Sequence, residues 1–365
     1  MVDVTHDPQA DAVYIRVGGG QFARTEHAGP FIYDVDAEGR IIGIEILSAS
    51  KVLSPGAWLN APRPEEALDA DAVEALFTPP KIQLGLNALR LEANGFRFDA
   101  IACGAPDAPI VLFLHGWPSF ATSWRAIMPL VAAAGFRAVA VDQRGYSPGA
   151  RPGAVADYAV DCLLADIEGF ARALAGSARF HLVGHDWGGL IAWPYAAHHP
   201  ERLASLTVLS TPHSKAFLEA IKTDPEQQRM SAYIGVFRQP GHVAEQALLG
   251  DGARKLRAIY GGKLPPEAVE ENVSRLSEPG ALTATLSWYR ALDNKRLGSP
   301  VTTPTLYIWG SEDLALGAAA ARATGKYVTG PYQFETLEGR SHWLPEEAPE
   351  TIAELLIAHL TRFPA

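Results

Sequence analysis

The sequence predicts an α/β protein with a mostly parallel sheet and helices on both faces, preceded by a small β-rich segment. Three observations carry this prediction. From residue 81 onward, short apolar runs alternate with helical patterns, which is typical of parallel sheets. One of these runs ends in the sharp turn Gly184-x-Asp186-x-Gly188 and continues into a helical pattern. The first 54 residues instead alternate apolar and polar positions, as antiparallel strands do.

Composition restricts the classes of function. The 365 residues, 48% of them apolar, suffice for one large core and a small additional module. The formal net charge of -10, with scattered Lys and Arg, argues against a nucleic-acid or anionic-membrane partner. The polar N-terminus lacks a signal or transit pattern, no apolar run is long enough for a membrane span, and the two cysteines lack metal-ligand spacing. We therefore expect a cytoplasmic protein without a metal site.

Residues 1–54 predict a three-stranded meander, with strands at 12–17, 31–35 and 41–46. The opening at 7–15, the strand at 39–46 and the following Ala49-Ser50-Lys51 resemble a small family of uncharacterised β domains. That resemblance implies no known activity. We expect a docking or oligomerisation role at most, which leaves a homo-oligomer open. Residues 55–80 are rich in Pro and Ala around a short helical pattern at 65–76, and we interpret them as a linker.

Residues 81–365 begin with a hairpin, because two strand patterns flank Asn94-Gly95. Apolar runs at 109–114, 138–141, 180–183, 203–209, 305–309 and 332–336 predict the main strands. Helical patterns occupy 123–134, 158–174, 190–199 and 349–360. The interval 213–297 interrupts the alternation and is helix-rich, so we expect a cap over the carboxyl edge of the sheet, where open α/β sheets bind ligands.

The turn around Asp186 has the spacing of a nucleophile elbow, in which a strained central residue stands clear of the sheet between small neighbours. A serine in that position needs a base before it can attack. An aspartate, with a reference pKa of about 3.9, is already ionised at neutral pH and can attack an sp3 carbon to form an ester. The alternative is an ordinary structural turn with a solvated carboxylate.

The motifs His115-Gly116-Trp117-Pro118, 142–147 and 184–189, followed by Asp313 and His342, resemble the α/β-hydrolase superfamily in its epoxide hydrolase and haloalkane dehalogenase branch. The chain order of that superfamily is nucleophile, acid, histidine. His342 lies between the last strand and the last helix. No carboxylate follows the 203–209 strand directly, so Asp313 is the expected acid, with Glu312 as the second candidate.

The resemblance also implies the accessory groups. Backbone amides of Trp117 and Trp187 are the expected oxyanion-hole donors. Epoxide hydrolases resemble one another in carrying two cap tyrosines, and the positions that match are Tyr233, four residues before Phe237, and Tyr289. A phenol with a pKa near 10 can protonate the alkoxide that leaves when an epoxide opens. Each tyrosine could instead be an ordinary aromatic of a helical cap.

Three functions remain in view from the sequence. The first is a cofactor-independent hydrolase that opens an apolar epoxide to a vicinal diol through an Asp186 ester. The second is a haloalkane dehalogenase with the same nucleophile, for which no clear second halide donor beside Trp187 is found. The third is a binding or sensing protein whose hydrolase domain is vestigial. The sequence leaves the particular substrate and the stereochemistry undetermined.

Overall fold

The computed structural model describes residues 3–8, 10–17, 22–28, 31–37, 40–53, 85–293 and 295–365. The chain divides into two compact units, Met1–Gln83 and Leu84–Ala365. The linker predicted at 55–80, with its helical pattern at 65–76, lies outside the described residues.

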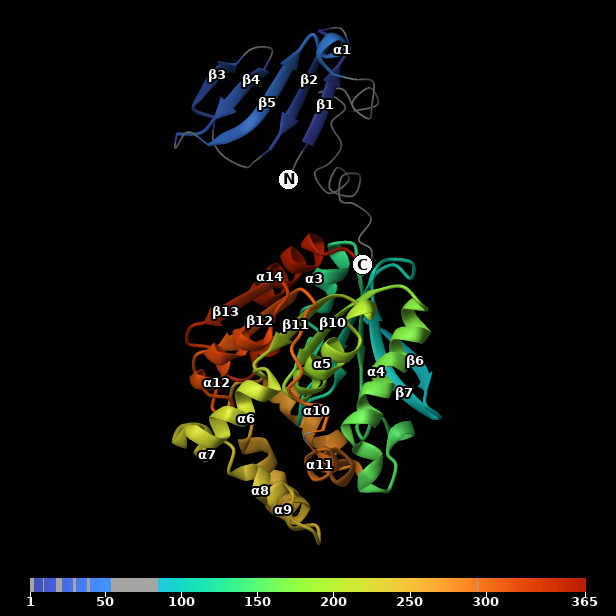
Figure 1. The fold of residues 1–365 in the computed structure, drawn as a ribbon. Coiled ribbons are helices and arrows are strands. Elements are labelled where there is room, and N and C mark those ends of the chain that lie inside the picture. The colour runs from blue at the N-terminus through green and yellow to red at the C-terminus, as the bar shows by residue number, and fades with distance from the viewer. Residues whose placement is uncertain are drawn as a thin grey trace. The chain divides into compact units, whose positions relative to one another are not determined.

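The first unit contains a five-stranded antiparallel sheet in the order β1-β2-β5-β4-β3 (Figure 1). Its elements are β1 (Asp3–Asp7), β2 (Ala12–Arg16), β3 (Arg24–Ala28), β4 (Phe31–Val35), β5 (Ile41–Leu47) and the short helix α1 (Ala49–Val52). Val13, Ile46 and Ala49 form its buried cluster.

The predicted number of three strands was wrong. The predicted runs became β2, β4 and β5, whereas β1 and β3 were missed. Both missed strands lie at the edges of the sheet and have the largely polar sequences DVTHD and RTEHA. Edge strands are often charged, which blunts pairing with other chains, so they lack the alternating apolar pattern that identifies inner strands.

The second unit is built on an eight-stranded sheet in the order β13-β12-β11-β10-β8-β9-β7-β6. Neighbouring strands are parallel from β13 to β9, and β7 is antiparallel to both β9 and β6. The strands are β6 (Asn87–Ala93), β7 (Phe96–Cys103), β8 (Ile110–Leu114), β9 (Arg137–Val141), β10 (Phe180–His185), β11 (Leu203–Leu209), β12 (Thr305–Gly310) and β13 (Tyr332–Leu337). The predicted mostly parallel sheet is confirmed.

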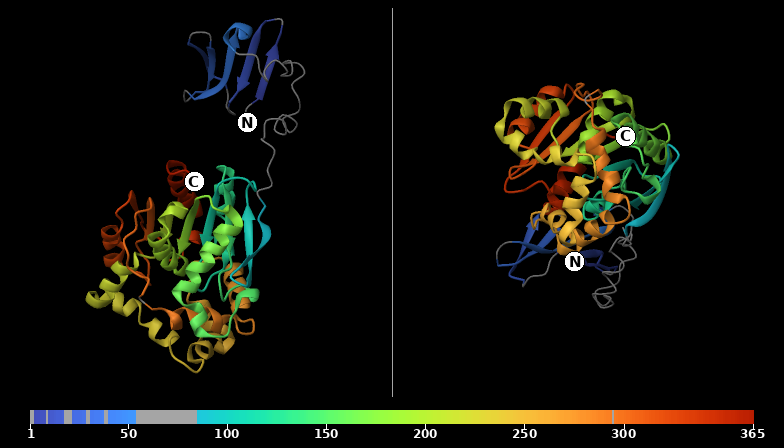
Figure 2. Two further views of the ribbon diagram at one scale, coloured as in Figure 1. Left: turned by 45° about the vertical axis from the view of Figure 1, so that its right-hand side comes forward. Right: turned by 90° about the horizontal axis from the view of Figure 1, so that it is seen from below.

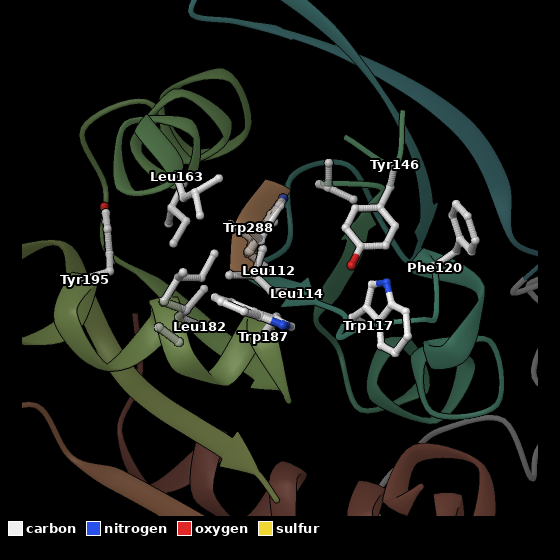
Figure 3. Packing of buried hydrophobic residues seen from close by; sticks show 14 of the residues in the cluster. Leu112, Leu114, Trp117, Phe120, Tyr146, Leu163, Leu182, Trp187, Tyr195 and Trp288 are labelled. Carbon is white, nitrogen blue, oxygen red and sulfur yellow. The ribbon is translucent and has the colours of Figure 1, made fainter. Parts of the chain in front are cut away.

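Residues alternate between two buried layers along the central strands. Leu112 and Leu114 face one cluster, with α4 and α5, whereas Val111 and Phe113 face the other, with α3 and α14. Figure 3 shows part of the first cluster, in which Leu112, Leu182 and Trp187 lie together. The helices that cover the sheet are α3 (Met128–Ala133), α4 (Val160–Ala175), α5 (Trp187–His198), α12 (Ala318–Ala323), α13 (Leu344–Glu347) and α14 (Pro349–Arg362). Strands buried on both faces explain why the sequence shows continuous apolar runs.

Between β11 and β12 the chain forms a group of helices that we call the cap helices. They are α6 (Ser214–Thr223), α7 (Pro225–Met230), α8 (Tyr233–Phe237), α9 (Val243–Ala258), α10 (Pro266–Leu276) and α11 (Ala281–Ala291). They gather at one end of the sheet in both Figure 1 and Figure 2. The Tyr260 hydroxyl donates to the Pro118 carbonyl and the Trp288 indole N–H donates to the Arg144 carbonyl, which ties this group to the loops that follow β8 and β9.

Within the part of the chain that the structure describes, none of the helices combines the length and apolar character that crossing a bilayer requires.

Candidate active site

Asp186 occupies the turn between β10 and α5. Its φ of 51° and ψ of -117° put this non-glycine residue in a sparsely populated backbone region, at a cost on the order of 1–3 kcal/mol. The turn is also crowded, since a Cβ on Gly184 would lie 2.5 Å from the Gly188 carbonyl oxygen, and a Cβ on Gly188 would lie 2.2 Å from that of Leu114. Strain and close packing together present the Asp186 side chain to a cavity that it lines.

The loop after β8 contacts the Asp186 carboxylate. The Trp117 backbone N–H donates to Asp186 Oδ1 at 2.7 Å. Gly116 makes this approach feasible, because a Cβ there would lie 2.3 Å from the Asp186 Cβ. Trp187 is the first residue of α5, where a backbone N–H has no partner within the helix. Amides in these two places suit the oxyanion-hole role predicted for Trp117 and Trp187.

His342 lies between two carboxylates. Its Nδ1 is 2.9 Å from Asp313 Oδ2, and its Nε2 is 3.6 Å from Asp186 Oδ2. The second oxygen of Asp313, Oδ1, accepts hydrogen bonds from the backbone N–H groups of Ala315 at 2.8 Å and Leu316 at 3.0 Å. Glu312 instead points to Lys263, with 3.9 Å between Oε2 and Nζ. The structure therefore brings Asp313, and not Glu312, to the histidine.

Burial and neighbouring charges act in opposite directions on the pKa values of Asp186 and His342. Burial disfavours an ionised Asp186, but hydrogen bonding to His342 and the charge of His342 hold the pKa of Asp186 below its usual value. Burial likewise disfavours a protonated His342, but the Asp313 and Asp186 carboxylates outweigh it and raise the pKa of His342 well above its usual value. The two carboxylates thus favour the protonated form of the His342 imidazole.

Tyr233 begins α8 and Tyr289 lies in α11, and both line the cavity beside Asp186. Their ring centroids are 6.2 Å apart, and the Tyr289 ring lies 4.7 Å from that of Trp187. Burial is the largest cause that raises the pKa of both hydroxyls, and the Asp186 charge acts in the same direction. Both phenols therefore keep their protons at neutral pH and can donate them as hydrogen bonds.

Asp186 contacts two cavities of unequal size. The larger has a volume of about 690 Å³ and is lined by, among others, Trp117, Tyr233, Tyr289, Asp313, His342 and the charged Arg229 and Lys263. The smaller, of about 80 Å³, is lined mainly by apolar side chains such as Leu190, Phe217, Ile234 and Leu292, with Trp187. Every residue predicted for the site lines at least one of the two cavities. In the described ranges, no group of three or more His, Cys, Asp or Glu side chains is arranged to hold a metal ion.

Sequence reasoning missed two residues near the site. Phe237 contacts both cap tyrosines, with centroid distances of 5.2 Å to Tyr233 and 5.1 Å to Tyr289. It belongs to the motif that located Tyr233, but an aromatic residue in a motif gives no sign of which way it faces. Gln227 is completely buried and binds backbone atoms 88 and 90 residues away. No sequence signal could have found Gln227, since its partners are peptide groups.

Comparison with known proteins extends these observations. Residues 109–349 match the profile of a family described as the alpha/beta hydrolase fold, and residues 3–50 match a family of unknown function. The chain is 33% identical to Epoxide hydrolase 3 of Xenopus tropicalis over 73% of its own length and 76% of that protein. It is 31% identical to Epoxide hydrolase A of Mycobacterium tuberculosis, covering 74% of itself and 96% of that protein. The crystal structure of Epoxide Hydrolase A from Mycobacterium thermoresistibile superposes with a TM-score of 0.68 at 27% identity, over 77% of this chain and 99% of the other.

Proposed function

The chain belongs to the α/β-hydrolase fold family as an enzyme of the epoxide hydrolase type, and we propose that it opens small apolar epoxides to vicinal diols through a covalent ester on Asp186. The observation that carries the proposal is the presence of three kinds of functional group around the Asp186 carboxylate. An imidazole nitrogen lies 3.6 Å from it, a backbone amide lies 2.7 Å from it, and two phenols share its cavity.

The first step forms the ester. The Trp117 amide binds Asp186 Oδ1, which leaves Oδ2 to attack the less hindered carbon of the epoxide. The bond between that carbon and the ring oxygen breaks, and the oxygen takes a proton from the pair formed by Tyr233 and Tyr289. An alkoxide is a very poor leaving group without this proton, so positioned phenols lower the barrier by general acid catalysis.

The second step hydrolyses the ester. Esterification removes the Asp186 charge, which is one of the causes that raise the pKa of His342. The protonated imidazole then releases its proton more readily, to the phenolate left by ester formation, and the neutral imidazole can accept one from a water that attacks Asp186 Cγ. The resulting oxyanion forms on Oδ1, within reach of the Trp117 amide, with Trp187 as the second proposed donor. Collapse breaks the bond between Asp186 Cγ and Oδ2. Oδ2 takes the second proton of the attacking water and leaves with the diol, so the cycle requires no cofactor.

A single turnover in heavy-oxygen water tests this route. The diol from the first turnover should carry an unlabelled oxygen from Asp186, and label should appear in the diol only in later turnovers. His342→Gln is a matched control, since it should form the ester and stop there. Solvent label in the first diol would show that water attacks the epoxide directly.

The haloalkane alternative uses the same nucleophile. A halide leaves without a proton, so replacing Tyr233 and Tyr289 by Phe should abolish epoxide opening and spare halide release. The presence of two protonated phenols beside the carboxylate favours the epoxide. A binding or sensing protein with a vestigial hydrolase domain would not need His342 at 3.6 Å from Asp186 and 2.9 Å from Asp313.

A further inference from the structure

Gln227 lies in α7, a cap helix, and its side chain pairs with the loop that follows β12. The Gly317 backbone N–H donates to Gln227 Oε1 at 2.8 Å, and Gln227 Nε2 donates to the Ala315 carbonyl at 2.9 Å. The primary amide thus binds an N–H and a C=O of one short segment at once. The side chain is completely buried, so water does not compete for these bonds.

The same segment holds Asp313. The backbone N–H groups of Ala315 and Leu316 donate to Asp313 Oδ1, while Asp313 Oδ2 faces His342. The position of residues 315–317 therefore sets the direction of the carboxylate that orients the imidazole. Gln227 binds the Ala315 carbonyl, which lies between these two amides along the chain, and the Gly317 N–H, which follows them.

Gln227 also binds Ser231, which lies among the cap helices. Gln227 Nε2 also donates to Ser231 Oγ at 2.9 Å, and the Ser231 backbone N–H donates to the Gln227 carbonyl at 3.0 Å. Ser231 lies two residues before Tyr233, and the Ile234 N–H donates to its carbonyl at 3.1 Å. One buried amide consequently contacts both the segment that supports Asp313 and the turn from which the Tyr233 helix begins.

We propose that Gln227 is a positioning residue that holds the triad acid Asp313 and the cap tyrosine Tyr233 in register. This inference rests on the function proposed above, because it assigns the two sides of the link to two chemical steps. The Asp313 side supports ester hydrolysis through His342. The Ser231 side supports ester formation through Tyr233.

The experiment compares Gln227→Met with Gln228→Met in the full-length protein. Methionine has a similar volume but offers neither an amide donor nor an amide oxygen, so the first variant loses all three side-chain bonds. Gln228 is the matched control, since it lies in the same helix, is exposed, and its side chain donates to the Ile221 carbonyl. Stopped-flow tryptophan fluorescence follows ester formation and decay, because Trp117 and Trp187 line the cavities, and mass spectrometry of quenched samples measures the ester itself.

Gln227→Met should slow ester hydrolysis on the order of 10²-fold, the effect of a displacement of about 1 Å at a reacting group. Because it also loses the bond to Ser231, ester formation should slow as well. Ser231→Ala, which removes only the bond toward Tyr233, should slow ester formation and leave hydrolysis unchanged. Gln228→Met should match the wild type in both steps.

A hydrolysis rate in Gln227→Met within twofold of the wild type, with only the melting temperature lowered, would overturn the role of Gln227 and leave a structural contact. The proposed function fails separately. In that case the wild-type protein itself would form no ester in the same experiment.

Discussion

Replacing Gly116 by Ala tests the geometry of the site most directly. Gly116 does not have a left-handed φ, so an alanine can adopt its backbone conformation. The added methyl group would instead meet the Asp186 side chain, at 2.3 Å from Asp186 Cβ and 2.5 Å from Asp186 Oδ1. The effect must therefore come from displacement of the carboxylate or of the loop that binds it.

The size of the effect follows from these distances. Carbon atoms in contact lie about 3.5–4.0 Å apart, so Asp186 and the loop must separate by more than about 1 Å. The 2.7 Å hydrogen bond from the Trp117 amide to Asp186 Oδ1 then lengthens beyond hydrogen-bonding distance. A misplacement of this size costs on the order of 10²-fold in rate, or about 2.7 kcal/mol of activation free energy.

The assay is kcat/KM for a styrene-type epoxide, together with the rate of ester formation in a single turnover and a circular dichroism spectrum to verify folding. Gly153→Ala is the matched control, because a Cβ there meets nothing within 4 Å. If folded Gly116→Ala retained kcat/KM within threefold of the wild type, the loop would not be holding the carboxylate in its reactive position.

Four further predictions follow. Asp313→Asn should let the ester accumulate, because an amide neither orients nor stabilises the imidazolium as a carboxylate does; a quenched sample without added mass would contradict this. The pKa of His342 is raised in the folded state. The free energy of unfolding that its protonation contributes is therefore complete below the unfolded pKa of about 6.5 and is lost as pH rises through the folded pKa. Denaturant titrations at several pH values should show that the free energy of unfolding depends less on pH in His342→Gln than in the wild type. Burial raises the pKa of Glu346 to about 8 from 4.5, so stability should fall between these pH values, and Glu346→Gln should remove that decline; an unchanged slope would refute it. Deleting residues 1–53 should leave kcat/KM unchanged, since all the proposed site residues lie beyond them, and gel filtration of the same sample would report any loss of oligomer.

Much of the fold could be predicted because local sequence patterns specify it. Strands buried on both faces require continuous apolar runs, which located β8, β10 and β12. The Asn94-Gly95 turn was readable because both residues adopt positive φ, at 51° and 79°, which those two residue types tolerate best. The polar edge strands β1 and β3 have no such pattern, and the prediction failed there.

The sequence likewise predicted only part of the candidate site. The elbow around Asp186 could be recognised because a strained turn needs glycines at defined spacing. The choice of Asp313 and His342 depended on chain order and on their places after β12 and β13. Sequence alone did not show that Glu312 faces Lys263 or that Phe237 contacts both cap tyrosines.

The sequence by itself predicted most element types and the parallel sheet, and it singled out Asp186 as the proposed nucleophile, because periodicity, turn chemistry and side-chain charge are properties of neighbouring residues. Only the tertiary structure decided that the buried Gln227 amide in a cap helix binds the loop that follows Asp313, and that the absence of a side chain on Gly116 lets Asp186 accept a hydrogen bond from the Trp117 amide. Those contacts join surfaces far apart in the chain, and their distances result from the packing of whole helices and strands.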